Sequence, residues 1–192
     1  MRFAERTKCM KSSEIRELLK ITQDKEIISF GGGLPSPDSF PIGEIDKLCT
    51  AVLRKYGADA LQYGITEGVP ELRETLAKRM EKFGINCSEE NIIVTNGTQE
   101  ALELVSKILL DAGDAAIVEV PTYLGAIYSF RIYQADFVTV GMDSNGMKTE
   151  ELEEKLKKMN EKEREKVKFI YTIPNFHNPA GVTLLWRGGN TS

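Results

Sequence analysis

Before residue 91, apolar residues recur at helical spacing between stretches without any period. Spacing at i, i+3 and i+4 is typical of helices that bury one face. A helix is favoured to begin after a capping hydroxyl, or with proline in its first turn, and to stop at glycine. The pattern predicts helices that begin near Ser12 or Ser13, that cover residues 45–53, and that run from Pro70 to Gly84.

From residue 91 onward, short apolar runs alternate with segments of helical period. Parallel strands need long crossover connections, usually helices, so this alternation is typical of a parallel sheet. We predict an α/β fold, mostly parallel with helical crossovers. The expected strands cover residues 92–95, 115–118, 137–140 and 169–173, and the expected helices cover residues 99–110, 123–133 and 149–159.

Two segments show neither the helical spacing nor the short apolar runs of strands. Residues 30–37 form a glycine-rich loop with three consecutive glycines, whose lack of side chains permits close approach of a ligand. Residues 184–192 follow no pattern at a place where a further helix is expected. We therefore divide the chain into an arm with the glycine-rich loop (1–43), a main domain (44–183) and an unrelated tail (184–192).

Composition narrows the classes of function. The 192 residues carry 25 Lys+Arg against 29 Asp+Glu, a net charge of −4, without the clustered basic face of a nucleic-acid binder. No apolar run approaches the ~20 residues that span a bilayer, and no leader is evident, so a cytoplasmic protein is expected. The three cysteines are widely spaced and His177 is the single histidine, so we expect neither a metal site nor a disulfide framework.

The sharpest chemical signal is the segment that ends with Gly97, Thr98 and Gln99. It follows an expected strand and opens an expected helix, where backbone N–H groups and the helix dipole attract a phosphate. Glycine permits close approach, and the threonine hydroxyl can donate a further hydrogen bond. Taken alone, the segment is equally compatible with an ordinary helix cap.

Four other side chains follow expected strands or lie in expected loops. Tyr123 comes after the second expected strand, where its ring could stack on a flat ligand or pack at a helix start. Asn178 follows the last strand, where its amide could bind a ring substituent or simply form an Asn-Pro turn. Tyr63 could offer a phenol to a phosphate or be a packed ring, and His177 is expected to be a loop residue rather than a catalyst.

The order of these motifs is distinctive. The chain resembles the fold-type-I pyridoxal-phosphate aminotransferases of class I/II, and most of all the branch with the aminoadipate and kynurenine aminotransferases. The resemblance runs from about residue 28 to 183. It rests on Gly32-Gly33-Leu34-Pro35, Gln62-Tyr63-Gly64, Gly68-x-Pro70-x-Leu72-Arg73, Asn96-Gly97-Thr98-Gln99, Pro121-Thr122-Tyr123 and Asn178-Pro179-Ala180-Gly181.

This resemblance implies a role for each motif. The fold would be an incomplete large domain of that family, preceded by a helical arm, and the whole enzyme would be a homodimer acting on an amino acid and a 2-oxo acid. The implied contacts are phosphate for Gly97, Thr98 and Gln99, the pyridine ring for Tyr123, the 3-oxygen of the ring for Asn178, the partner subunit's phosphate for Tyr63, and the substrate for Gly33.

The family's later motifs have no matching position. They comprise an Asp for the pyridine nitrogen, a second Tyr, the Schiff-base Lys of a Ser-x-x-Lys motif, and an Arg for the substrate carboxylate. The last lysine is Lys168, before the Asn-Pro-Ala-Gly element, so we expect no turnover from this chain alone. A frameshift or premature stop after Thr183 is our hypothesis for the unrelated tail.

Three other interpretations stay open at this stage. The residues that match bind cofactor and do not select the reaction, so a carbon–sulfur lyase or decarboxylase of the same fold is possible. A regulator of the MocR type is disfavoured, because the 28 residues before the glycine-rich loop are too few for its DNA-binding domain. The last is a non-functional fragment that aggregates.

Overall fold

The computed structural model describes residues 2–9 and 33–185, which belong to two units. The first, here called the sheet unit, comprises residues 1–11 and 96–192; the second, the helical unit, comprises residues 12–95. The helix expected near Ser12 and most of the glycine-rich loop lie outside the described residues. Each unit is described by itself.

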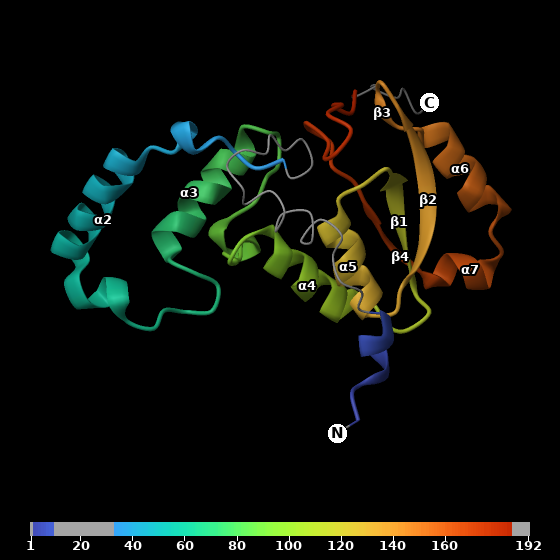
Figure 1. Cartoon of the computed structure of the whole chain (residues 1–192), viewed down its shortest axis with the longest axis horizontal. Coiled ribbons are helices and arrows are strands. Elements are labelled where there is room, and N and C mark those ends of the chain that lie inside the picture. Colours follow the sequence, from blue (N-terminus) through green and yellow to red (C-terminus); the bar gives the residue numbers. More distant parts are fainter. Residues whose placement is uncertain (1, 10–32, 186–192) are drawn as a thin grey trace, which may run out of the picture. The chain divides into compact units, whose positions relative to one another are not determined.

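The sheet unit is built on four strands in the order β3-β2-β1-β4 (Figure 1). β1 pairs in parallel with both β2 and β4, whereas the short β3 is antiparallel to β2. The mostly parallel sheet with helical crossovers is therefore confirmed. The strands are β1 (Ala115–Val120), β2 (Asp136–Asp143), β3 (Gly146–Met147) and β4 (Val167–Tyr171).

Helices cover both faces of this sheet (Figure 1). On one face, Leu102, Ala126 and Phe130 pack with Ala116 and Val118 of β1. On the other face, Leu152 and Leu156 pack against Ile117 of β1 and Val140 of β2. The helices of this unit are α4 (Thr98–Leu109), α5 (Leu124–Ile132), α6 (Thr149–Lys158) and α7 (Glu161–Lys166), with the 3-10 helix η1 (Glu5–Cys9).

The helical unit contains α2 (Ile42–Tyr56), α3 (Pro70–Glu81) and the 3-10 helices η2 (Pro37–Ser39), η3 (Gly57–Leu61) and η4 (Glu89–Asn91). Arg73 of α3 is buried and its guanidinium donates to the carbonyl oxygens of Glu89 and Ile92, at 2.7–3.1 Å. This contact ties α3 to η4. Of the helices predicted in this unit, the two that fall on described residues are confirmed, with α2 longer than expected.

Two predictions made from the pattern need correction. Residues 92–95 form no strand: Ile92 has extended dihedral angles, but the segment has no ladder partner among the described residues. Extended backbone becomes a strand only when a neighbour accepts and donates its hydrogen bonds. α7 forms between residues 159 and 169, where the pattern predicts no element, and all of its residues are exposed.

Candidate functional site

The candidate site lies where the crossovers of the sheet change sides. β1 stands between β2 and β4; α5, which joins β1 to β2, packs on one face, and α6, which precedes β4, packs on the other. In open parallel sheets, ligands bind outside the carboxyl ends of the strands at such a switch point. Tyr123 follows β1 and Asn178 follows β4, so the fold brings these two predicted residues to the same edge.

The amino-terminal end of α4 supplies an open cradle for an anion. Its N-cap is Gly97, at φ +85°, which provides no side-chain cap, and a Cβ added there would meet nothing within 4 Å. Thr98 and Gln99 form the exposed first turn. Because the first N–H groups of a helix have no partner within it, this turn presents donors and the positive end of the helix dipole.

Gln99 joins this turn to the start of α5. Its Nε2 donates to Oγ of Ser129 at 2.7 Å and lies 3.4 Å from the carbonyl oxygen of Gly125. Ser129 is buried, and its hydroxyl in turn donates to Gly125 at 3.2 Å. The side chain of Gln99 therefore links α4 to α5, and its backbone N–H lies in the first turn. Its contact with a phosphate stays a prediction.

Tyr123 is the N-cap residue of α5, and its ring lies over Gly125. A Cβ on Gly125 would come within 2.4 Å of the ring, so only glycine leaves the ring in its place. The ring also packs beside the core on the α4–α5 face of the sheet. The neighbouring strand β4 contributes Tyr171, whose pKa is raised by burial, with a smaller contribution from Tyr123.

Asn178 lies on an exposed loop whose backbone is closed by several hydrogen bonds. The N–H of His177 donates to the carbonyl of Val182 at 2.8 Å, and the N–H of Leu184 donates to the carbonyl of Pro174 at 2.7 Å. Oγ of Thr183 accepts from the N–H of Phe176 at 3.2 Å. The loop thus holds the exposed Asn178 amide on a fixed backbone.

Sequence reasoning missed a buried acid beside this loop. Glu119, in β1, and His177 are each about 1% exposed, and their Oε2 and Nε2 atoms are 3.1 Å apart. Because the buried Nε2 of His177 has no hydrogen-bond partner among the described residues, we describe this contact as electrostatic. The signal in the sequence was an acidic residue inside the apolar run Ala115–Val120. His177 lies in a loop, as expected, but its side chain is buried.

Two predicted site residues belong to the helical unit. Tyr63 is 98% exposed, and Gly33 has a φ of +59°, in the region that favours glycine. The backbone N–H of Tyr63 donates to its neighbour Gln62, and its ring is free of packing contacts that would assign it to a core. Their placement near the cofactor remains a proposal.

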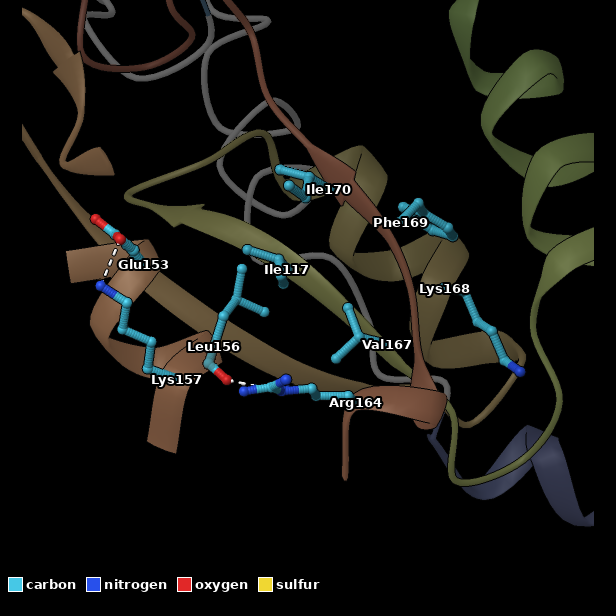
Figure 2. Close-up of a pocket in the computed structure, with 9 residues that line it drawn as sticks. All are labelled: Ile117, Glu153, Leu156, Lys157, Arg164, Val167, Lys168, Phe169 and Ile170. Carbon is cyan, nitrogen blue, oxygen red and sulfur yellow. Dashed lines mark hydrogen bonds and ion pairs between the residues drawn. The ribbon is translucent and has the colours of Figure 1, made fainter. Parts of the chain in front are cut away.

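A separate apolar groove of about 520 Å³ lies beside β4 (Figure 2). Ile117 and Val167 form its floor, and Arg164 of α7 donates to the carbonyl of Leu156 at one end. Its residues Ile117, Leu156 and Val167 belong to the α6–α7 face of the sheet, opposite to α4 and α5. The groove is therefore distinct from the candidate site.

The structure also bears on metals and membranes. Within residues 2–9 and 33–185, no three His, Cys, Asp or Glu side chains are grouped as metal ligands would be. Over the same described residues, no helix is both long and apolar enough to cross a bilayer.

Comparison with known proteins defines the class. Residues 37–185 match the family model for aminotransferase class I and II, and the chain belongs to this family. It is 47% identical to aromatic-amino-acid aminotransferase 1 of Thermococcus litoralis, over 95% of this chain and 44% of that protein. The resemblance inferred from the motifs is thus confirmed.

Solved structures agree. The kynurenine aminotransferase of Pyrococcus horikoshii, in complex with PMP, superposes with a TM-score of 0.86 at 44% identity, over 95% of this chain and 45% of that one. The α-aminoadipate aminotransferase of Thermus thermophilus, complexed with N-(5'-phosphopyridoxyl)-L-leucine, superposes with a TM-score of 0.80 at 39% identity. This match covers 95% of this chain and 43% of that one. The chain spans a little under half the length of the relatives it matches.

Pyridoxal phosphate is the cofactor of this family, and the residues present fit it. The α4 turn offers backbone donors for a phosphate, the ring of Tyr123 offers a flat apolar surface, and Asn178 offers an exposed amide. Next to Tyr123, the hydroxyl of Thr122 is buried with no hydrogen-bond partner among the described residues, which leaves a donor for a ligand.

Proposed function

We propose that this chain is the cofactor-binding, amino-terminal half of an aminotransferase that moves an amino group from an amino acid to a 2-oxo acid. When bound, pyridoxal phosphate supplies the electron-withdrawing ring that such chemistry needs. The observation that carries the proposal is the contact of Gln99 with Ser129, because it brings the phosphate-type turn of α4 to the start of α5 beside Tyr123.

The chain's own residues would divide the binding work. The first turn of α4, with Gly97 and Thr98, would hold the phosphate by backbone donors, and the Thr98 hydroxyl would add a further donor. Tyr123 would pack against the pyridine ring, and the Asn178 amide would donate to the ring's 3-oxygen. The Schiff-base Lys has no matching position, so we infer reversible, non-covalent binding and no turnover by these 192 residues.

The remaining assignments concern the whole enzyme. Gly33 would approach the substrate, and Tyr63 would reach the phosphate bound by a second subunit of a homodimer. The apolar stripe of α2 supports such a dimer, because Ile45, Leu48 and Val52 are each more than 40% exposed. The division into an arm (1–43), a cofactor-binding domain (44–183) and a tail (184–192) completes the proposal. Free Cys49 and Cys87 fit a reducing cytoplasm.

Equilibrium dialysis of the pure chain against pyridoxal phosphate and against pyridoxal tests the proposal. We expect saturable binding of the phosphate ester, competition by inorganic phosphate, and at least about tenfold weaker binding of pyridoxal, because one charge-assisted contact contributes about 1.5 kcal/mol or more. Borohydride reduction and mass spectrometry measure capture by surface lysines. Equal affinity for the two compounds would contradict the phosphate site, and amino transfer above the rate of free cofactor would contradict the inferred inactivity.

A further inference from the structure

The buried carboxylate of Glu119 is the least expected group in the sheet unit. Glu119 is the penultimate residue of β1, on the same face as Ile117, and is 1% exposed. A carboxylate at such a position is costly unless several donors surround it. The donors that surround it come from the segment after β4.

Three groups of that segment face the carboxylate. Oε1 of Glu119 accepts from the hydroxyl of Thr172 at 2.8 Å, and Oε2 accepts from the backbone N–H of Ile173 at 3.0 Å. Nε2 of His177 lies 3.1 Å from Oε2. One side chain of β1 therefore holds both the start of the loop and its buried histidine.

His177 carries this constraint to the far side of the loop. Its Nδ1 accepts from the backbone N–H of Ala180 at 3.3 Å, which ties the imidazole ring to the later part of the loop. Its backbone N–H donates to Val182, and its carbonyl accepts from Gly181. Asn178 and Pro179 lie between these fixed points, and both are exposed.

We propose that Glu119 and His177 are a positioning pair that fixes the loop backbone so that the Asn178 amide meets the pyridine ring of the cofactor. This inference rests on the proposed function, which assigns Asn178 to that ring. An asparagine on an exposed loop has to be held by its backbone if its amide is to meet a ligand within a fraction of an ångström. The pair supplies that restraint from the rigid end of β1.

A purely structural role predicts something different. If the pair merely stabilised the fold, its removal would lower stability without depending on Asn178, and a well-packed apolar pair would serve equally well. A positioning role predicts that the effects of Glu119 and Asn178 on cofactor affinity are coupled. The two roles can therefore be separated by a double-mutant cycle.

The test uses the full chain, with the affinity for pyridoxal phosphate measured by equilibrium dialysis. Glu119→Ala and Asn178→Ala are each expected to weaken binding about tenfold, the equivalent of one lost hydrogen bond of about 1.4 kcal/mol, and the double variant no further. Glu119→Gln keeps an acceptor for Ile173 and is expected to restore most of the affinity. Lys168→Met, which breaks the ion pair with Asp114 (3.4 Å) before β1, is the control.

Hydrogen–deuterium exchange of the cofactor-free chain supplies a second readout. Glu119→Ala is expected to speed exchange over residues 173–182 at least about tenfold, whereas Lys168→Met leaves these amides protected. If Glu119→Ala does not fold, Thr172→Val removes one donor to Glu119 at an exposed position and enters the same cycle with Asn178→Ala.

The outcomes separate this inference from the function beneath it. Three results would contradict the positioning role of the pair: additive losses of affinity, unchanged exchange in residues 173–182, or failure of Glu119→Gln to restore binding. None of these three results would contradict the proposed cofactor site. A wild-type chain that binds no pyridoxal phosphate, or an Asn178→Ala chain that binds it as the wild type does, would overturn the proposed function itself, and this inference with it.

Discussion

Gly125 and Tyr123 show how a missing carbon can set the position of a neighbouring ring. Both stand at the start of α5, and the ring of Tyr123 occupies the volume that a Cβ on Gly125 would need. The atoms in conflict are at the far end of the tyrosine side chain, so the ring can swing away at little cost to the backbone. A residue at position 125 thus controls the ring without any polar contact.

We expect Gly125→Ala to weaken the binding of pyridoxal phosphate about tenfold while leaving the unfolding midpoint nearly unchanged, because alanine favours the helix but displaces the ring. Equilibrium dialysis and thermal melting measure the two effects. The matched control is Gly43→Ala: Gly43 is likewise the second residue of its helix, α2, and an added Cβ meets nothing within 4 Å. Equal affinity in both variants would show that the ring does not contact the cofactor.

Glu151 links α6 to the sheet at the same residue scale. Its carboxylate accepts from Nζ of Lys155 at 2.7 Å and from the N–H of Gly141 at 3.1 Å. The hydrogen bond from Lys155 and then that from Gly141 lower the pKa of Glu151 below its ordinary value of 4.5. A carboxyl whose pKa is depressed in the folded state stabilises the fold above its unfolded pKa, and this contribution is lost as the pH falls through the folded pKa.

Glu151→Gln is therefore expected to flatten the loss of stability between about pH 5 and pH 3 relative to the wild type. Urea denaturation followed by circular dichroism at several pH values measures the effect. Lys155→Met removes the larger cause and should flatten the same part of the profile. An unchanged slope in both variants would show that this carboxylate does not link stability to pH.

At the scale of elements, α7 depends on its cap more than on its length. It has six residues, and Asn160 Oδ1 accepts from the N–H of Glu163 at 3.0 Å while the Glu163 carboxylate accepts from the N–H of Asn160 at 2.9 Å. A helix this short is marginal unless its ends are satisfied. Because β4 begins directly after α7, the cap also sets where that strand starts.

Asn160→Ala should lower the free energy of unfolding by about 1 kcal/mol, the usual value of an N-cap side chain. Chemical denaturation measures the change, and exchange of the α7 amides locates it. Lys162→Ala, at an exposed position of the same helix, provides the control and should change little. Equal effects of the two substitutions would contradict the role of the cap.

At the scale of the whole molecule, apolar surface stands uncovered in both units. Along α2, Ile42, Ile45 and Leu48 are between 51% and 70% exposed. In the sheet unit, β4 is an edge strand among the described residues, Ile170 on it is 48% exposed, and the groove of Figure 2 runs alongside. Uncovered apolar faces and free strand edges favour association.

We therefore expect the chain to self-associate and to have low thermal stability. Leu48→Lys should shift the species seen by size exclusion with light scattering toward the monomer, because it puts a charge in the middle of the α2 stripe. Thr50→Lys, which adds the same charge at another exposed position of α2, should not. A wild-type chain that is monomeric and melts cooperatively would refute the expectation.

Much of this protein could be predicted from its sequence, because the periods of its apolar residues are local properties. The helices at 42–56, 70–81, 98–109 and 149–158 and the three parallel strands follow from them. The motifs also singled out Gly97 and Tyr123, which the structure places at the starts of α4 and α5. Residues 92–95 were the exception, because an apolar run specifies only that backbone may extend and not that a neighbour is present to pair with it.

Only the tertiary structure shows the contacts between residues that are far apart in the sequence. The contact of Gln99 with Ser129 joins residues from two helices, and the burial of Glu119 against His177 joins β1 to a loop 58 residues later in the sequence, 177 − 119. No local pattern distinguishes a buried histidine in an Asn-Pro loop from an exposed one. Sequence determined which polar and aromatic groups the chain carries. The folding of parallel strands, which gathers their carboxyl ends at one edge, decided which of these groups lie at the same edge.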